Sequence, residues 1–194
     1  MTSANSDASS DQLILITGPA RSGKSEWAET LAAASGQAVV YVATAQVDST
    51  DLEWQNRIQA HRYRRPQHWT TLQVPVDLST TIQQASTKTC LLVDSLGTWL
   101  ANILDQDESS WEQTLEILLH SLEQTSCTVI LVAEEVGWGV VPAYPVGRTF
   151  RDRLGSLVRG IGAIANPVYL VTSGYVLNLS TLGFPLAQKL NRFP

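Results

Sequence analysis

The chain has 194 residues, a formal net charge of -5 at pH 7 and a sequence pI near 5.1, and 44% of its residues are hydrophobic. That length is typical of one domain, and the apolar content is sufficient for a buried core. The net negative charge argues against non-specific binding to nucleic acid or to a membrane surface. No apolar run approaches the ~18 residues that a membrane span needs, so we expect no membrane insertion.

The N-terminal residues 1–12, MTSANSDASSDQ, are polar and have neither the basic nor the apolar region of a signal peptide. We therefore expect a disordered tail over 1–12, one domain over 13–194 and a cytoplasmic location. Cys90 and Cys127 stand in apolar runs without CxxC or Cys/His spacing, which is typical of buried thiols and not of a disulfide or a metal site.

Short apolar, β-branched runs predict buried strands at 13–17, 39–44, 90–95, 128–134 and 167–174. Their hydrophobicity is continuous and does not alternate, as a parallel sheet covered on both faces requires. The stretches between them predict helices at 25–34, 51–64 and 111–124, and a further one at about 146–165. Capping-box spacing at two helix starts pairs Thr50 with Glu53 and Ser109 with Glu112. The alternation of strand and helix predicts an α/β fold with right-handed crossovers.

The sequence GPARSGKS directly follows the first predicted strand and precedes a predicted helix, and it fits the pattern GxxxxGK[ST]. Backbone N–H groups of such a loop and the helix N-terminus cradle phosphate oxygens. Lys24 is expected to reach the β- and γ-phosphates and Ser25 to ligate Mg²⁺. The expected fold is therefore of the P-loop NTPase type, with a mostly parallel central sheet and helices on both faces. The nucleotide-binding residues expected in the loop are Gly18, Pro19, Ala20, Arg21, Ser22, Gly23, Lys24 and Ser25.

Asp94 lies at the carboxyl end of an apolar strand, in LLVDS, where a Walker-B-type carboxylate belongs. A role beside the metal ion is favoured for this residue. Capping of the helix that follows is the alternative.

A P-loop is compatible with a small-molecule kinase or transferase, a regulatory GTPase or a nucleic-acid motor. The guanine-reading tetrapeptide Asn-Lys-x-Asp of GTPases does not occur in this sequence. A motor on nucleic acid should have a broad basic surface, and this chain is acidic. Small-molecule chemistry is therefore favoured.

The segment RIQAHRYRRP, residues 57–66, holds four of the 13 basic residues and one of the three histidines. On a helix, Arg57, His61 and Arg64 share one face. A solvated charged face is the simplest interpretation, but charges of one sign cost helix stability. Flanking cations also keep an imidazole neutral, which is its nucleophilic form. These features favour a functional role for His61, whereas His68, in a predicted turn, and His120, in a helix, are more typical of incidental histidines.

The order of the motifs GPARSGKS, YVATAQ, RIQAHRYRRPQHW, LLVDSLGTWLANIL, EEVGWGVVP, GRTFRDRLG and LVTSG resembles one known family. It is similar to the adenosylcobinamide kinase / adenosylcobinamide-phosphate guanylyltransferase family of cobalamin biosynthesis. The resemblance extends from about Leu13 to about Leu179. The P-loop alone is generic, whereas the histidine–arginine segment together with EVGxGxVP is highly specific.

The resemblance implies a bifunctional enzyme that phosphorylates adenosylcobinamide from ATP or GTP. It then implies transfer of GMP from GTP to that phosphate through a guanylyl-histidine at His61, with Lys24 catalytic in the P-loop. Mg²⁺ would be held by Ser25 and Asp94, and family members form trimers, so EVGWGVVP and GRTFRDRLG are expected at a subunit interface or at the corrinoid pocket. Beyond the P-loop, the nucleotide contacts fall on Thr44, Ala45, Gln46, Arg62, Tyr63, Arg64, Arg65, Gln73 and Asp94.

The chain departs from the family pattern at three positions. Family members usually have Glu where Gln73 stands, Asn at the position of Val158 and Lys near Ser180. The alternative function is therefore a diverged P-loop nucleotide-binding protein, or a small-molecule kinase without guanylyltransferase activity.

Overall fold

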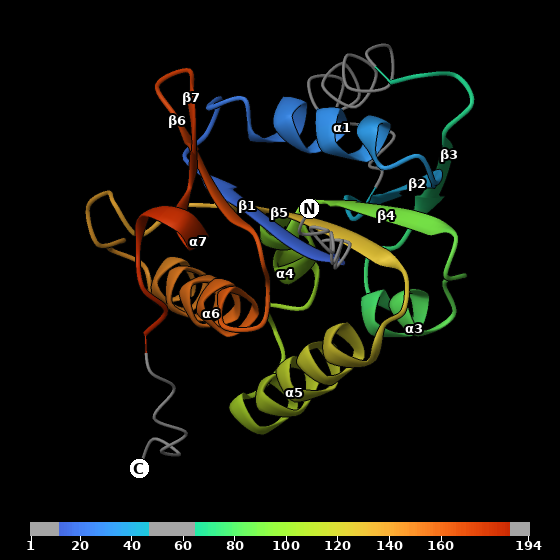
Figure 1. The fold of residues 1–194 in the computed structure, drawn as a ribbon. Coiled ribbons are helices and arrows are strands. Elements are labelled where there is room, and N and C mark those ends of the chain that lie inside the picture. The colour runs from blue at the N-terminus through green and yellow to red at the C-terminus, as the bar shows by residue number, and fades with distance from the viewer. Residues whose placement is uncertain (1–11, 47–64, 187–194) are drawn as a thin grey trace.

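Seven strands form one sheet in the computed structural model, which describes residues 12–46 and 65–186 (Figure 1). The strand order is β3-β2-β4-β5-β1-β6-β7. Every neighbouring pair is parallel except β6 and β7, which are antiparallel. The strands are β1 (Leu13–Gly18), β2 (Ala38–Ala43), β3 (Thr70–Gln73), β4 (Thr89–Asp94), β5 (Thr128–Glu134), β6 (Val168–Thr172) and β7 (Tyr175–Asn178).

Helices cover both faces of the sheet, so the predicted α/β fold class is confirmed (Figure 1). One face packs against α1 (Lys24–Ala34). The other face is covered by α3 (Leu78–Gln83), α4 (Leu96–Asn102), α5 (Glu108–Gln124) and α6 (Pro145–Gly162). A short helix, α7 (Leu179–Leu182), follows the β6–β7 hairpin. Within the described ranges, no helix has the length and apolar character needed to cross a bilayer.

The apolar core has two layers, one on each side of the sheet. Ile14 and Ile16 of β1 pack on the α1 side together with Ala28 of that helix. Leu13 and Leu15 point to the opposite layer, which α3, α4, α5 and α6 cover. Successive residues of β1 point to opposite faces of the sheet, and both faces are covered. The strand therefore appears in the sequence as a continuous apolar run.

The prediction of free, buried cysteines is confirmed for Cys90 and Cys127. The capping box predicted for α5 is wrong, because the helix begins at Glu108 and its N-cap is Asp107. The Asp107 side chain accepts a hydrogen bond from the amide of Ser110 (2.8 Å). This turn holds several acidic and hydroxyl residues that could cap a helix, and the N-cap is Asp107, whose backbone is extended.

The strand predicted at 167–174 ends earlier, at Thr172, because Ser173 and Gly174 have positive φ and form a two-residue hairpin turn. Its residues are also mostly half-buried and not fully buried. The helix predicted at 51–64 and the capping pair Thr50 and Glu53 lie outside the described residues.

Candidate nucleotide-binding site

The P-loop joins the carboxyl end of β1 to the N-terminus of α1, as predicted. Arg21 and Gly23 have positive φ angles of 58° and 94°, so the loop turns sharply before the helix begins. Gly18 lies so close to β6 that a Cβ atom at this position would clash with the carbonyl oxygen of Val171. A side chain at position 18 would therefore push the loop away from the sheet.

Lys24 is the first residue of α1, and it is buried, with 8% of its surface exposed. Its Nζ donates a hydrogen bond to the carbonyl oxygen of Pro19 (3.2 Å), so the side chain folds back over the loop. The Ser22 hydroxyl is buried, and it finds no hydrogen-bond partner among the described residues. An unsatisfied buried hydroxyl is costly, and a phosphate oxygen in the loop would satisfy it.

Asp94 ends β4, with one strand, β5, between it and the P-loop strand. The alternative role as a helix cap falls to its neighbour, because Ser95 is the N-cap of α4 and its side chain accepts a hydrogen bond from Thr98 N. Asp94 is half-buried and accepts a hydrogen bond at Oδ2 from the hydroxyl of Tyr41 (2.9 Å). Oδ1 is the oxygen of this carboxylate that Tyr41 does not contact.

A divalent metal fits this donor set. The Ser25 hydroxyl stands in the first turn of α1, and Asp94 stands at the same edge of the sheet, so both offer the hard oxygen ligands that Mg²⁺ and similar ions take. The part of the chain that the structure describes has no cluster of three or more His, Cys, Asp or Glu side chains. A metal here would share its coordination with the phosphate oxygens of a nucleotide.

Two acidic residues at the end of β5 belong to this edge, although the sequence analysis named Glu135 only as part of EVGWGVVP and did not select Glu134. Glu134 accepts hydrogen bonds from the Ser95 hydroxyl and from the amide of Gly97 (3.0 Å). Glu135 accepts one from the Thr17 hydroxyl (2.6 Å). They connect β5 to α4 on one side and to β1 on the other. The signal that could have found them is the position of EE directly after a buried strand, since carboxyl ends of parallel strands meet at one edge.

The loop after β2 is attached to its neighbours by specific hydrogen bonds. Thr44 is fully buried, and its hydroxyl bonds to the backbone of Ser95. Asn102 of α4 donates to the carbonyl oxygens of Thr44 (2.7 Å) and Pro75 (2.9 Å). The Gln73 side chain is exposed, and its amide donates to the carbonyl oxygen of Ala45. The side chains of Thr44 and Gln73 therefore hold this loop, which continues through Ala45 and the exposed Gln46.

Of the basic residues in the segment 57–66, Arg65 alone lies within the described residues, and its guanidinium carbon is 3.4 Å from the centroid of the Tyr41 ring. His61, Arg62, Tyr63 and Arg64 lie outside them. Of the other two histidines, His68 stands in a turn and His120 on α5, as predicted, and both are exposed.

The loop over 135–144 exposes several apolar side chains and is fixed to the start of α6. Arg148 donates hydrogen bonds to the carbonyl oxygens of Pro142 (3.1 Å) and Ala143 (2.7 Å). Farther along the helix, the buried Arg153 donates to Leu104 O and Glu108 Oε2, both at 3.2 Å. The exposed apolar residues of this region are Val136, Trp138, Val140, Val141, Tyr144 and Val146.

Two of the family departures have structural roles here. Val158 lies on α6 and packs against the larger core layer, so an apolar side chain suits this position. The Ser180 hydroxyl accepts a hydrogen bond from the amide of Val168 (2.9 Å), which connects α7 to β6.

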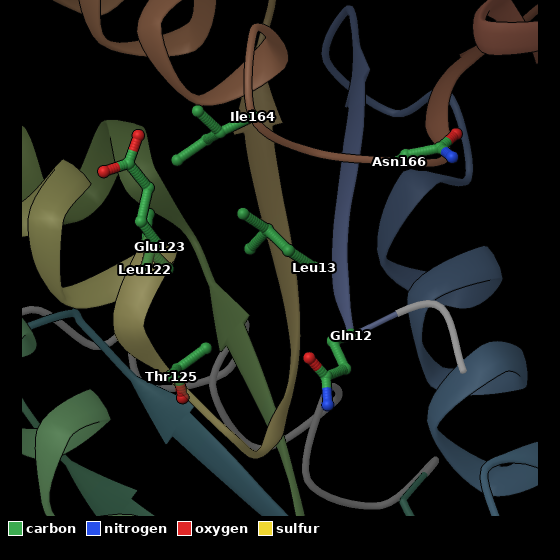
Figure 2. Close-up of a pocket in the computed structure, with 7 residues that line it drawn as sticks. All are labelled: Gln12, Leu13, Leu122, Glu123, Thr125, Ile164 and Asn166. Atoms are coloured by element: carbon green, nitrogen blue, oxygen red, sulfur yellow. The ribbon is translucent and has the colours of Figure 1, made fainter. Parts of the chain in front are cut away.

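An open cavity of about 320 Å³ lies near the amino ends of the strands, whereas the P-loop follows the carboxyl end of β1. Figure 2 shows the residues that line this cavity. The cavity is formed where β1 begins and where α5 and α6 end, and among the described residues that line it only Glu123 is charged. A site with a carboxylate and no cation does not suit phosphate. The lining residues are Gln12, Leu13, Leu122, Glu123, Thr125, Ile164 and Asn166.

The class of protein follows from three features: the glycine-rich loop after β1, the buried Lys24 at its end, and Asp94 at the end of β4, two strands away. This is a P-loop nucleotide-binding protein. Solved structures with low sequence identity have the same fold. An ATPase of a type III secretion system is 13% identical with a TM-score of 0.51, over 89% of this chain and 53% of that one. The Pyrococcus horikoshii OT3 protein of project PH0250 is 8% identical with a TM-score of 0.55, over 94% of both chains.

The chain belongs to the family described as cobinamide kinase / cobinamide phosphate guanyltransferase, whose sequence pattern matches residues 14–179. It is 43% identical to the bifunctional adenosylcobalamin biosynthesis protein CobP of Pseudomonas aeruginosa, over 89% of this chain and 98% of the relative. It is 37% identical to the bifunctional adenosylcobalamin biosynthesis protein CobU of Escherichia coli K12, over 84% of this chain and 96% of the relative. The family resemblance predicted from the motifs is confirmed.

Proposed function

We propose that this protein catalyses two successive steps on adenosylcobinamide. In the first, the hydroxyl of the substrate attacks the γ-phosphorus of ATP or GTP, the bond to the β-phosphate oxygen breaks, and adenosylcobinamide phosphate forms. The observation that supports this step is the P-loop of a chain belonging to this family, with Lys24 folded over the loop and Ser22 unsatisfied beside it. Lys24 would stabilise the charge that develops on the transferred group.

The second step is transfer of GMP to the new phosphate. An imidazole nitrogen of His61 attacks the α-phosphorus of GTP, an N–P bond forms and pyrophosphate leaves. A phosphate oxygen of adenosylcobinamide phosphate then attacks the same phosphorus, the N–P bond breaks, and adenosylcobinamide-GDP is released. Arg62, Arg64 and Arg65 would neutralise the triphosphate and the departing pyrophosphate.

Mg²⁺ is the proposed metal, bound with the nucleotide and held by Ser25 and Asp94. It would supply positive charge to the phosphates, while the chain's own cations and backbone amides orient them. The nucleotide contacts proposed outside the P-loop are those at Thr44–Gln46, at the arginine segment and at Gln73. Because the Gln73 amide already bonds to Ala45, a contact of this residue with nucleotide would compete with that hydrogen bond.

We propose a homotrimer that acts in the cytoplasm, as the family resemblance implies. Two exposed apolar regions support association, since monomeric proteins rarely expose contiguous patches of this kind. One is the loop before α6, and the other includes β7, α7 and the residues that follow. In the second region the exposed side chains are Tyr175, Val176, Leu177, Leu179, Leu182, Phe184 and Leu186. Light scattering of the purified protein would test the subunit number.

The second candidate is a P-loop protein that binds nucleotide without guanylyltransferase activity, and the departures at Gln73, Val158 and Ser180 favour it. Thermal unfolding with and without adenosylcobinamide distinguishes the two, because a ligand that binds the native state raises the melting temperature. The bifunctional enzyme should be stabilised by the corrinoid, and mass spectrometry should find adenosylcobinamide phosphate and then its GDP derivative. A protein stabilised by nucleotide alone would support the second candidate.

A further inference from the structure

Tyr41 contacts two parts of the proposed site that the chain separates widely. It lies on β2, with 5% of its surface exposed, on the sheet face that α1 covers. The register pairs Tyr41 with Leu92 and Ala43 with Asp94, so the side chain reaches diagonally along the sheet to the end of β4. There its hydroxyl donates to Asp94 Oδ2 at 2.9 Å.

The flat face of the same ring holds the guanidinium of Arg65 at 3.4 Å from the ring centroid. Arg65 is the last arginine of the basic segment, and the turn that follows it is itself fixed. Trp69 is 8% exposed, packs in the core layer of Tyr41, and donates its backbone amide to Pro66 O (3.1 Å). The end of the basic segment is therefore attached to the sheet directly above Tyr41.

The protonation state of the phenol suits these two contacts. A tyrosine hydroxyl ordinarily ionises only at about pH 10, so it is uncharged at neutral pH. The hydroxyl therefore keeps its proton and remains a donor to the carboxylate. A neutral phenol between a carboxylate and a guanidinium fixes the orientation of both without cancelling either charge.

We propose that Tyr41 is a positioning residue that couples the metal-side carboxylate Asp94 to the guanidinium of Arg65. The hydroxyl sets which oxygen of Asp94 faces the metal, and the ring sets where Arg65 stands. The proposal rests on the proposed function for the role of each partner, but the two contacts can be broken separately.

The test compares Tyr41→Phe, which keeps the ring and removes the hydroxyl, with Tyr41→Leu, which removes both. The readout is the affinity for a fluorescent GTP analogue, first in EDTA and then over a titration of Mg²⁺. For Tyr41→Phe we expect an unchanged affinity in EDTA and a half-saturating Mg²⁺ concentration about tenfold higher, the factor typical of one hydrogen bond lost from a charged group. For Tyr41→Leu we expect the same shift and also weaker binding in EDTA, because Arg65 loses its contact with the ring.

A second readout is covalent GMP labelling at saturating Mg²⁺, which should remain near the wild-type rate in Tyr41→Phe and fall in Tyr41→Leu. Tyr41→Met also removes the ring and the hydroxyl while filling the buried space with a flexible apolar side chain, and it replaces Tyr41→Leu if that variant does not fold. Unchanged Mg²⁺ dependence in Tyr41→Phe, or equal behaviour of Phe and Leu variants in EDTA, would overturn the coupling. Wild-type protein that binds the analogue but never becomes labelled would instead overturn the proposed function, and the affinity measurements would still test Tyr41.

Discussion

Thr44 and Ser95 bond to each other twice, although 51 positions separate them. The Thr44 hydroxyl donates to the carbonyl oxygen of Ser95 (2.8 Å) and accepts from its amide (3.0 Å). The exit of β2 and the N-cap of α4 are thereby joined. Thr44 thus fixes the loop that begins after β2 to Ser95, the residue that follows Asp94.

Thr44→Val should destabilise the protein, because it keeps the side-chain shape but leaves a buried amide and a buried carbonyl of Ser95 without this partner. We expect a loss of about 1–3 kcal/mol in the free energy of unfolding. Denaturant titration measures it, and Thr44→Ser, which keeps the hydroxyl, is the matched control. Equal free energies of unfolding for the Val and Ser variants would show that these two hydrogen bonds contribute nothing to stability.

Lys24→Ala should remain folded and lose phosphorylation of the corrinoid by about 100-fold or more, since one charged donor to the transferred group is removed. The Nζ makes a single hydrogen bond, to Pro19, so little native structure depends on it. Lys88→Ala, at an exposed position after α3, is the control with the same charge change. A near-normal phosphorylation rate in Lys24→Ala would exclude the P-loop assignment.

Gly18→Ala should disrupt the P-loop, because a Cβ there would meet the carbonyl oxygen of Val171 on β6, which is backbone and cannot move aside. Nucleotide affinity and melting temperature should both fall. Gly155→Ala is the control, because a Cβ at that helical position meets nothing within 4 Å. This control should be stabilised by about 0.5–1 kcal/mol. A Gly18→Ala variant with wild-type affinity would contradict the close packing of β6 on the loop.

Burial raises the pKa of the Cys90 thiol from 9.0 to about 11. A pKa raised in the folded state means that the thiol favours folding fully below pH 9.0 and that this contribution is lost between pH 9.0 and about 11. The stability of the wild type should therefore fall more steeply over this window than that of Cys90→Ala. Parallel stability curves for the two proteins would show that the thiol does not titrate there.

The sequence predicted the strands that are buried on both faces, because burial determines their pattern of apolar residues. β1, β4 and β5 are continuous apolar runs because both faces of each strand are covered, and the P-loop pattern sits between a strand and a helix as expected. β3 was not predicted, because its residues TTLQ are all exposed at the edge of the sheet and its pairing with β2 provides its order. β7 is also mostly exposed and was missed for the same reason, whereas α3 was missed because its six residues are too few to show a helical period.

The site was predicted where a local motif defines it and missed where tertiary contacts build it. Lys24, Ser25 and Asp94 stand at the expected edge. The roles of Tyr41 and Glu134 depend on the register of β2, β4 and β5, which no local pattern specifies. The Gln73 amide was expected near the nucleotide, and its hydrogen bond to Ala45 follows from the β2–β3 pairing.

The covalent step at His61 is the central claim, and one labelling measurement tests it most directly. Purified protein is incubated with Mg²⁺ and GTP labelled at the α-phosphate, denatured, and assayed for bound label in wild type, His61→Ala and His61→Asn. We predict label in the wild type that acid releases and alkali does not, as for a phosphoramidate, and none in either variant, while both variants still phosphorylate adenosylcobinamide. Label that persists in His61→Ala, or a wild type that never becomes labelled, would contradict the account.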